Sequence, residues 1–313
     1  MTADPDGGAQ PQMVTADVAG GQLTAAVWGP GVAHQGGPRQ RPGAPVILAV
    51  HGITASHLAW LPVARWLADS PGPDLTLIAP DLRGRGASSD LPGPYGLAGH
   101  AADLVALLDA VGVDQAVVVG HSMGGFVALV LAHLYPARVG RLVLVDGGLP
   151  LPLPAAADPR DALESLVGPA ARRLSMTFAD PEAYRRYWRA HPALQDWTPD
   201  LAAYVDYDLV GTPPAMHSRT SAAAVRADSI DMGTGPAARE ALVRLRHPAR
   251  FLRAERGMLD EPTALYDRAE VEGWVRQLPS LTAADVASTN HYTILFSPAG
   301  AAAVAAAIRL PAS

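Results

Sequence analysis

The sequence predicts an α/β protein with a mostly parallel central sheet, helices on both faces and an inserted helical cap. Short apolar, β-branched runs alternate with segments whose apolar residues recur at helical spacing, which indicates parallel strands joined by helices. The alternation stops over residues 149–235 and then resumes. We therefore assign residues 13–148 and 236–313 to one core and residues 149–235 to the cap. Right-handed crossovers would place the helices on both faces of the sheet.

The first half of the core is expected to begin with an antiparallel hairpin. Its two strands cover residues 13–18 and 23–28, and the polar residues 1–12 before it are predicted to be disordered. Further strands are expected at residues 45–50, 75–79, 115–119 and 141–145. Helices are expected around residues 60–67, 104–111 and 126–134, from their apolar spacing or from a wholly apolar run.

The segment 149–235 shows helical patterns but no convincing buried strand. Its helices are expected at residues 160–174, 181–190, 201–209 and 222–230. Many of the chain's aromatic residues fall here, where they either line an apolar pocket or pack the cap helices together. The core then ends with strands at 250–254 and 281–287 and helices at 265–278 and 300–308.

Composition and charge disfavour several classes of function. The chain has 313 residues, a net charge of −6 and no cysteine, so disulfides, a thiolate nucleophile and cysteine metal sites are excluded. The acidic balance disfavours nucleic acid as the main partner. We find no secretory signal and no apolar run of the roughly 20 residues that cross a bilayer. The histidines lack metal-ligand spacing and no nucleotide-binding loop is present, so we expect a cytoplasmic protein without metal or cofactor.

A tight turn around Ser122 is the strongest functional signal. The stretch Gly120-His121-Ser122-Met123-Gly124 fits the Gly-x-Ser-x-Gly nucleophile elbow and joins the predicted strand 115–119 to the predicted helix 126–134. In such a turn the serine adopts a strained backbone conformation, and glycines stand where a Cβ would clash. The strain would point the serine hydroxyl out of the sheet, beside the first amides of the helix.

A serine nucleophile needs a general base and an acid that orients this base. His291 follows the last predicted strand, which fits the chain order serine, acid, histidine. Three carboxylates could supply the acid. We rank Asp260 first, because it lies in the loop beyond the strand at 250–254, then Asp146 and then Glu255.

Acyl transfer also needs donors for the oxyanion of its tetrahedral intermediate. The backbone amide of Met123, directly after the nucleophile, is one candidate, and the amide of Ile53 is the other. Trp60 and His51 lie near this second donor in the sequence and are the expected pocket residues. For His51, bracing the loop is the favoured alternative to contact with substrate.

Together these motifs resemble the α/β-hydrolase fold superfamily, in particular capped serine hydrolases such as carboxylesterases and lipases. The resemblance covers nearly the whole chain from Met13 and includes Pro80-Asp81-x-Arg83-Gly84-x-Gly86, a loop that is usually structural in the family. It implies an acyl-enzyme that water hydrolyses. Epoxide hydrolases and haloalkane dehalogenases share the fold but need an aspartate nucleophile, where this chain has Ser122.

We therefore expect a serine hydrolase that cleaves carboxylic esters of small to medium apolar substrates, with the ester and water as its partners. A carbon–carbon bond hydrolase, a lactonase or a cofactor-free perhydrolase would use the same three residues. A ligand-binding member of the fold without turnover is the hypothesis from another class. Plausible occupants for all three catalytic roles favour an enzyme.

Overall fold

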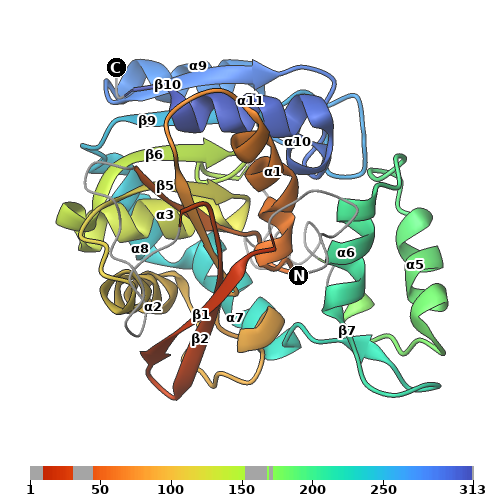
Figure 1. Ribbon diagram of the computed structural model, residues 1–313. Helices are drawn as coiled ribbons and strands as arrows, with labels where there is room; N and C mark the ends of the chain where they lie inside the picture. Colours follow the sequence, from red (N-terminus) through yellow and green to blue (C-terminus); the bar gives the residue numbers. More distant parts are fainter. Residues whose placement is uncertain (1–9, 31–44, 152–167, 169–171, 312–313) are drawn as a thin grey trace.

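The computed structural model describes residues 10–30, 45–151, 168 and 172–311, and within them eight strands form one central sheet (Figure 1). The strand order is β1-β2-β4-β3-β5-β6-β9-β10. Neighbouring strands run parallel, apart from the antiparallel pairs β1–β2 and β2–β4. The strands are Gln12–Val18 (β1), Gly21–Trp28 (β2), Val46–Val50 (β3), Thr76–Pro80 (β4), Ala116–His121 (β5), Val139–Val145 (β6), Ala249–Ala254 (β9) and Leu281–Val286 (β10). The predicted fold class is confirmed.

Helices cover both faces of this sheet. One face carries α1 (Leu61–Asp69), α10 (Thr293–Phe296) and α11 (Pro298–Arg309), and the other carries α2 (Leu97–Ala110), α3 (Met123–Leu134), α8 (Pro236–Val243) and α9 (Arg268–Gln277). Successive side chains of a strand point to opposite faces. Accordingly, Leu48 and Val50 of β3 belong to one hydrophobic core, and Ile47 and Ala49 belong to the other. This two-sided burial explains why β3 is a continuous apolar run.

Some helix ends differ from the predicted ones for identifiable reasons. Helix α2 begins at Leu97, seven residues before the predicted range, and its first turns bury the polar residues His100 and Asp103, which interrupt the apolar pattern. Helix α3 already begins at Met123. The glycines at its start do not interrupt it, since they serve close packing: a Cβ on Gly124 would lie 2.1 Å from the carbonyl oxygen of Val50.

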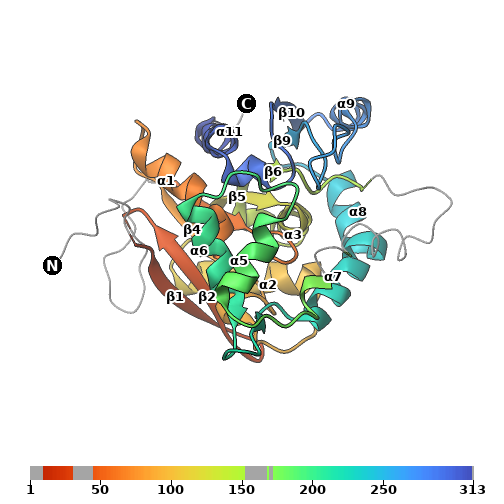
Figure 2. The same cartoon turned by 90° about the vertical axis from the view of Figure 1, so that its right-hand side faces the viewer.

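The segment between β6 and β9 contains α5 (Pro181–Arg189), α6 (Pro199–Asp208) and α7 (Ala222–Thr234). It also contains the two-residue strands β7 (Leu209–Val210) and β8 (His217–Ser218), which are too short to leave a pattern in the sequence. Figures 1 and 2 show α5 and α6 on the side toward which the parallel strands point. The expected helix at 160–174 falls mostly outside the described residues, as does most of the stretch 1–12 that was expected to be disordered.

Candidate active site

Ser122 occupies a strained turn between β5 and α3. Its φ is +55°, a value that L-residues other than glycine rarely adopt. Backbone packs around the turn so closely that a side chain would fit neither at Gly120, just before it, nor at Gly147, which follows β6. A Cβ on Gly120 would lie 2.2 Å from the carbonyl oxygen of Gly124, and one on Gly147 would lie 2.1 Å from that of Ser122. These close approaches fix where the Ser122 side chain starts.

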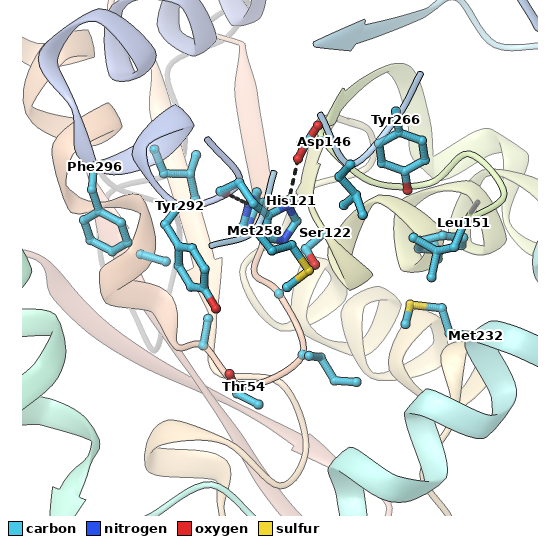
Figure 3. A pocket seen from close by; sticks show the side chains of 18 of the residues that line it. Thr54, His121, Ser122, Asp146, Leu151, Met232, Met258, Tyr266, Tyr292 and Phe296 are labelled. Carbon is cyan, nitrogen blue, oxygen red and sulfur yellow. Dashed lines mark hydrogen bonds and ion pairs between the residues drawn. The ribbon is translucent and has the colours of Figure 1, made fainter. Parts of the chain in front are cut away.

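His291 and Asp146 form a buried hydrogen bond in the same pocket as Ser122 (Figure 3). The Nδ1–H of His291, in the loop after β10, donates to Oδ2 of Asp146 at 2.7 Å. Asp146 directly follows β6 and is fully buried, and its Oδ1 accepts the backbone N–H of Ala254 at 3.1 Å. With its Nδ1 proton committed to the carboxylate, a neutral His291 carries its lone pair on Nε2.

Asp260, ranked first as the acid, is engaged elsewhere. Its carboxylate accepts from Arg256 Nε at 2.7 Å and from the side-chain amide of Asn290 at 3.0 Å. The hydrogen bond from Arg256 is the main reason why the pKa of Asp260 lies below its ordinary value. Glu255 accepts the backbone N–H of Ser288. Neither carboxylate lines the pocket, so the geometry reverses the order of preference in favour of Asp146.

Residues 52–55 follow β3 and carry the Ile53 amide, and we call them the oxyanion loop after the role expected of this amide. The carbonyl of Gly52 accepts from His51 Nδ1–H at 2.7 Å and from the Ala55 amide at 3.2 Å. In a trans peptide the N–H points opposite to the C=O, so the Ile53 N–H points away from both donors. The Met123 amide is the first of α3, where helix geometry leaves backbone N–H groups without an intrahelical acceptor.

The two expected pocket residues, Trp60 and His51, do not line the pocket. Trp60 has no exposed surface, because the short 3₁₀ turn His57–Trp60 directs its ring into the core, while Ala59 reaches the pocket. His51 is also fully buried, and its Nε2 accepts the N–H of Leu82 at 3.0 Å. Burial lowers the pKa of His51 to about 4, so the ring is neutral at neutral pH. His51 therefore has a structural role, because its ring links Gly52 of the oxyanion loop to Leu82 in the loop after β4.

The structure places His121 beside His291, a contact that the motif alone did not reveal. Its Nε2–H donates to the backbone carbonyl of His291 at 2.8 Å, and the two ring centroids are 4.7 Å apart. Burial, together with the nearby His291, holds the pKa of His121 well below 6.5. A neutral His121 therefore anchors the loop that carries His291.

The pocket itself is apolar and has two sides. Figure 3 shows Tyr292 and Phe296 on one side of Ser122, and Leu151 and Met232 on the other. Among the described residues that line the pocket none is Arg or Lys, and Asp146 is the sole carboxylate. Sequence reasoning identified Ile53, Ser122, Asp146 and His291 but missed most of the other lining residues, because most of these lie in loops or at helix ends. The lining residues are Gly52, Ile53, Thr54, Ala55, Ala59, His121, Ser122, Phe126, Asp146, Leu151, Tyr204, Met232, Met258, Leu265, Tyr266, His291, Tyr292, Leu295 and Phe296.

Two further kinds of feature are absent from the described part of the chain. No group of three or more His, Asp or Glu side chains in these residues is placed to bind a metal ion. None of the described helices combines the length and hydropathy that a membrane span requires.

Comparison with known proteins identifies relatives over different lengths. The chain is 36% identical over 168 residues to the lipase LipV of Mycobacterium tuberculosis, a match that covers 53% of this chain and 58% of that protein. It is 37% identical over 107 residues to a putative carbamate hydrolase, RutD, of Caulobacter segnis, covering 34% of this chain and 39% of that one. The chain thus spans less than two thirds of the length of these curated relatives.

Solved structures match over nearly the whole chain. An E-2-(acetamidomethylene)succinate hydrolase superposes with a TM-score of 0.75 at 22% identity, covering 95% of this chain and 97% of that one. A thermophilic esterase from Thermogutta terrifontis gives a TM-score of 0.63 at 22% identity, covering 96% and 97%. At this identity the likeness concerns the fold. The family model for the alpha/beta hydrolase fold matches residues 45–207, more than half of the chain, and the protein therefore belongs to the α/β-hydrolase fold family.

Proposed function

We propose that the protein is a serine hydrolase that cleaves uncharged carboxylic esters. Ser122 is the nucleophile, His291 the general base and Asp146 the acid that orients it. The observation that carries this proposal is the 2.7 Å hydrogen bond from His291 to Asp146, in one pocket with a serine at φ +55°. Nucleophile, base and orienting acid are the groups that acyl transfer to a serine requires.

The proton transfers follow from the tautomer of His291. Its Nε2 lone pair takes the hydroxyl proton of Ser122 as the oxygen attacks the ester carbonyl, and Asp146 stabilises the imidazolium that forms. The amides of Met123 and Ile53 stabilise the oxyanion of the tetrahedral intermediate. Collapse of the intermediate leaves an acyl group on Ser122, while the imidazolium gives its proton to the leaving alcohol. Water, activated by the same imidazole, then releases the acid.

The lining of the pocket supports an apolar, compact substrate. The cavity volume of the pocket is about 70 Å³. Since one water-sized group needs roughly 10–15 Å³ on this measure, the space suits a few non-hydrogen atoms on each side of the carbonyl. The two apolar sides of the pocket, which Figure 3 shows, offer separate places for the acyl and alcohol parts of the ester. No Arg or Lys stands among the described lining residues, so none of them offers a fixed positive charge that would favour an anionic substrate.

We also propose that the segment 149–235 acts as the cap of this pocket. Tyr204 of α6 and Met232 of α7 both belong to this segment and line the pocket. The names of the relatives, a lipase and a putative carbamate hydrolase, agree with acyl chemistry but leave the ester itself a proposal.

A chain-length series of p-nitrophenyl esters tests the proposed function. We expect kcat/KM to be highest for the acetate or butyrate and to fall for longer acyl groups. Ser122→Ala should abolish turnover, whereas Ser89→Ala, in a surface loop away from the pocket, should not change it. If no ester is hydrolysed in a Ser122-dependent way, the esterase assignment is wrong.

A further inference from the structure

A buried arginine holds the oxyanion loop from behind. Arg85 lies in the loop after β4 and its side chain has no exposed surface. Its Nε donates to the carbonyl of Ile53 at 2.9 Å, and its Nη1 donates to the carbonyl of Arg83 at 2.9 Å and to the carboxylate of Asp228. One guanidinium therefore joins the oxyanion loop to a buried anion.

That anion comes from the inserted segment. Asp228 lies on α7 and is fully buried, and its Oδ2 also accepts Nε2–H of His100, on α2, at 2.9 Å. Burial alone would raise the pKa of Asp228, but His100 and Arg85 outweigh this effect and hold the pKa below its ordinary value. The carboxylate is therefore charged at neutral pH, and it ties the insert to both the core helix α2 and the loop after β4.

The cluster is poorly arranged for stability alone. Within the described residues, three of its buried polar atoms find no hydrogen-bond partner: Nη2 of Arg85, Nδ1 of His100 and Oδ1 of Asp228. A buried ion pair gains little net stability over apolar packing, and unpartnered buried atoms reduce this gain further. A role in positioning the oxyanion loop explains a charge cluster at this place better than a role in stability does.

The hydrogen bond from Arg85 to the Ile53 carbonyl indicates that the cluster positions the oxyanion loop. The peptide before the Ile53 Cα is held through the Gly52 carbonyl, by His51 and Ala55, and the peptide after it is held through the Ile53 carbonyl, by Arg85. With both flanking peptide planes fixed, the two backbone dihedrals of Ile53 are fixed as well. The direction of its N–H is then set before substrate arrives.

We propose that Arg85 is a positioning residue for the Ile53 amide and that Asp228 makes this positioning depend on the inserted segment. The inference rests on the proposed function, in which the Ile53 amide stabilises the oxyanion. Loss of either side chain frees the peptide after Ile53 and leaves His51 and Ala55 as remaining anchors of the loop, so we expect the Ile53 amide to be held less precisely in the transition state. Ground-state binding of the ester depends on the apolar lining and is retained.

The same loop supplies a matched control. Arg83, two residues before Arg85, forms a pair with Asp103 that is also buried, through contacts of 2.9 Å and 2.8 Å. Its remaining hydrogen bonds go to the carbonyls of Ala19 and Pro92, in the hairpin turn and a nearby loop, rather than to the oxyanion loop. Removing the charge from Asp103 therefore disturbs a comparable ion pair without releasing Ile53.

The test compares Asp228→Asn with Asp103→Asn in the full-length protein. For p-nitrophenyl acetate, we expect Asp228→Asn to lower kcat by about 10- to 100-fold at little change in KM, because a misaligned donor acts on the transition state. Its affinity for a trifluoromethyl ketone, which binds serine as an oxyanion, should fall in parallel. Asp103→Asn should keep kcat within about two-fold of the wild-type value, even if its melting temperature falls by as much as that of Asp228→Asn.

A second variant covers the case in which Asp228→Asn does not fold. Arg85→Lys keeps a cation beside Asp228 but lacks the Nε–H that reaches Ile53, and it should show the same loss of kcat. Equal kcat losses in Asp228→Asn and Asp103→Asn, or wild-type kcat in Arg85→Lys, overturn the inference. Absence of Ser122-dependent hydrolysis in the wild-type protein is a different result and overturns the proposed function instead.

Discussion

Replacing Asp146 by asparagine tests which acid serves His291. The carboxylate of Asp146 accepts two hydrogen bonds, from His291 Nδ1–H and from the amide of Ala254. An asparagine side chain has one oxygen and one NH₂ group, so one of these donors must face another donor. The histidine avoids this conflict by moving its proton to Nε2, and a protonated Nε2 cannot accept the proton of Ser122.

The size of the effect follows from the loss of the correct tautomer. In serine proteases, the equivalent change lowers kcat by about 10⁴ while the geometry stays intact. Because Asp146 is fully buried, solvent cannot replace the missing charge, so we expect a loss of about 10³ to 10⁴. This loss corresponds to roughly 4–5 kcal/mol of transition-state stabilisation. Initial rates with p-nitrophenyl acetate measure it, with a thermal melt to verify folding.

Asp260→Asn is the matched control. Its ion pair with Arg256 is partly exposed, and such pairs contribute about 0–1 kcal/mol. We expect kcat to stay within a few-fold of the wild-type value. If Asp260→Asn lowers kcat as much as Asp146→Asn does, the assignment of the acid from the hydrogen-bond geometry is refuted.

Two further predictions concern packing and pH. Gly125→Ala places a Cβ 2.4 Å from the carbonyl oxygen of Gly147, so we expect a fall of several kcal/mol in unfolding free energy by urea denaturation. The Cβ of Gly140→Ala comes closest to the tip of the Gln115 side chain, at 3.3 Å, so this change should be nearly neutral; equal losses would contradict the packing argument. His51 has a folded pKa of about 4 against an ordinary value of 6.5, so the unfolded state binds more protons between these values and stability falls as pH decreases through this window. In His51→Gln, the unfolding free energy should fall less steeply with decreasing pH, by up to about 1.4 kcal/mol per pH unit. An unchanged slope would count against the burial of His51 as a neutral ring.

Local sequence was sufficient to predict the strained turn at Ser122 and the fold class. The apolar run of β5, the glycines around Ser122 and the apolar helix α3 are contiguous, and each obeys a rule that needs no tertiary information. The alternation of strands and helices likewise predicted the mostly parallel sheet, which the structure confirms.

The choice among the acids could not be made in this way. Asp146 and Asp260 both follow strands, and their distances from His291 depend on the order of strands in the sheet and on loop shape. The loop after β9 instead brings Asp260 within reach of Arg256, four residues earlier in the chain.

The pocket lining was hidden for related reasons. Trp60 is close to the oxyanion loop in sequence, but a single 3₁₀ turn decides whether its ring faces the pocket or the core. Phe296, which does line the pocket, belongs to the four-residue helix α10, and such a helix is too short to show a periodic pattern.

The most direct test of the central claim is to trap the acyl-enzyme. The protein is mixed with p-nitrophenyl acetate, quenched in acid within the first turnover, digested and analysed by mass spectrometry. We predict one acetyl group on the peptide that contains Ser122, and none in Ser122→Ala. Hydrolysis that proceeds at the wild-type rate in Ser122→Ala, or an acetyl group on another residue in the wild-type protein, would contradict the account.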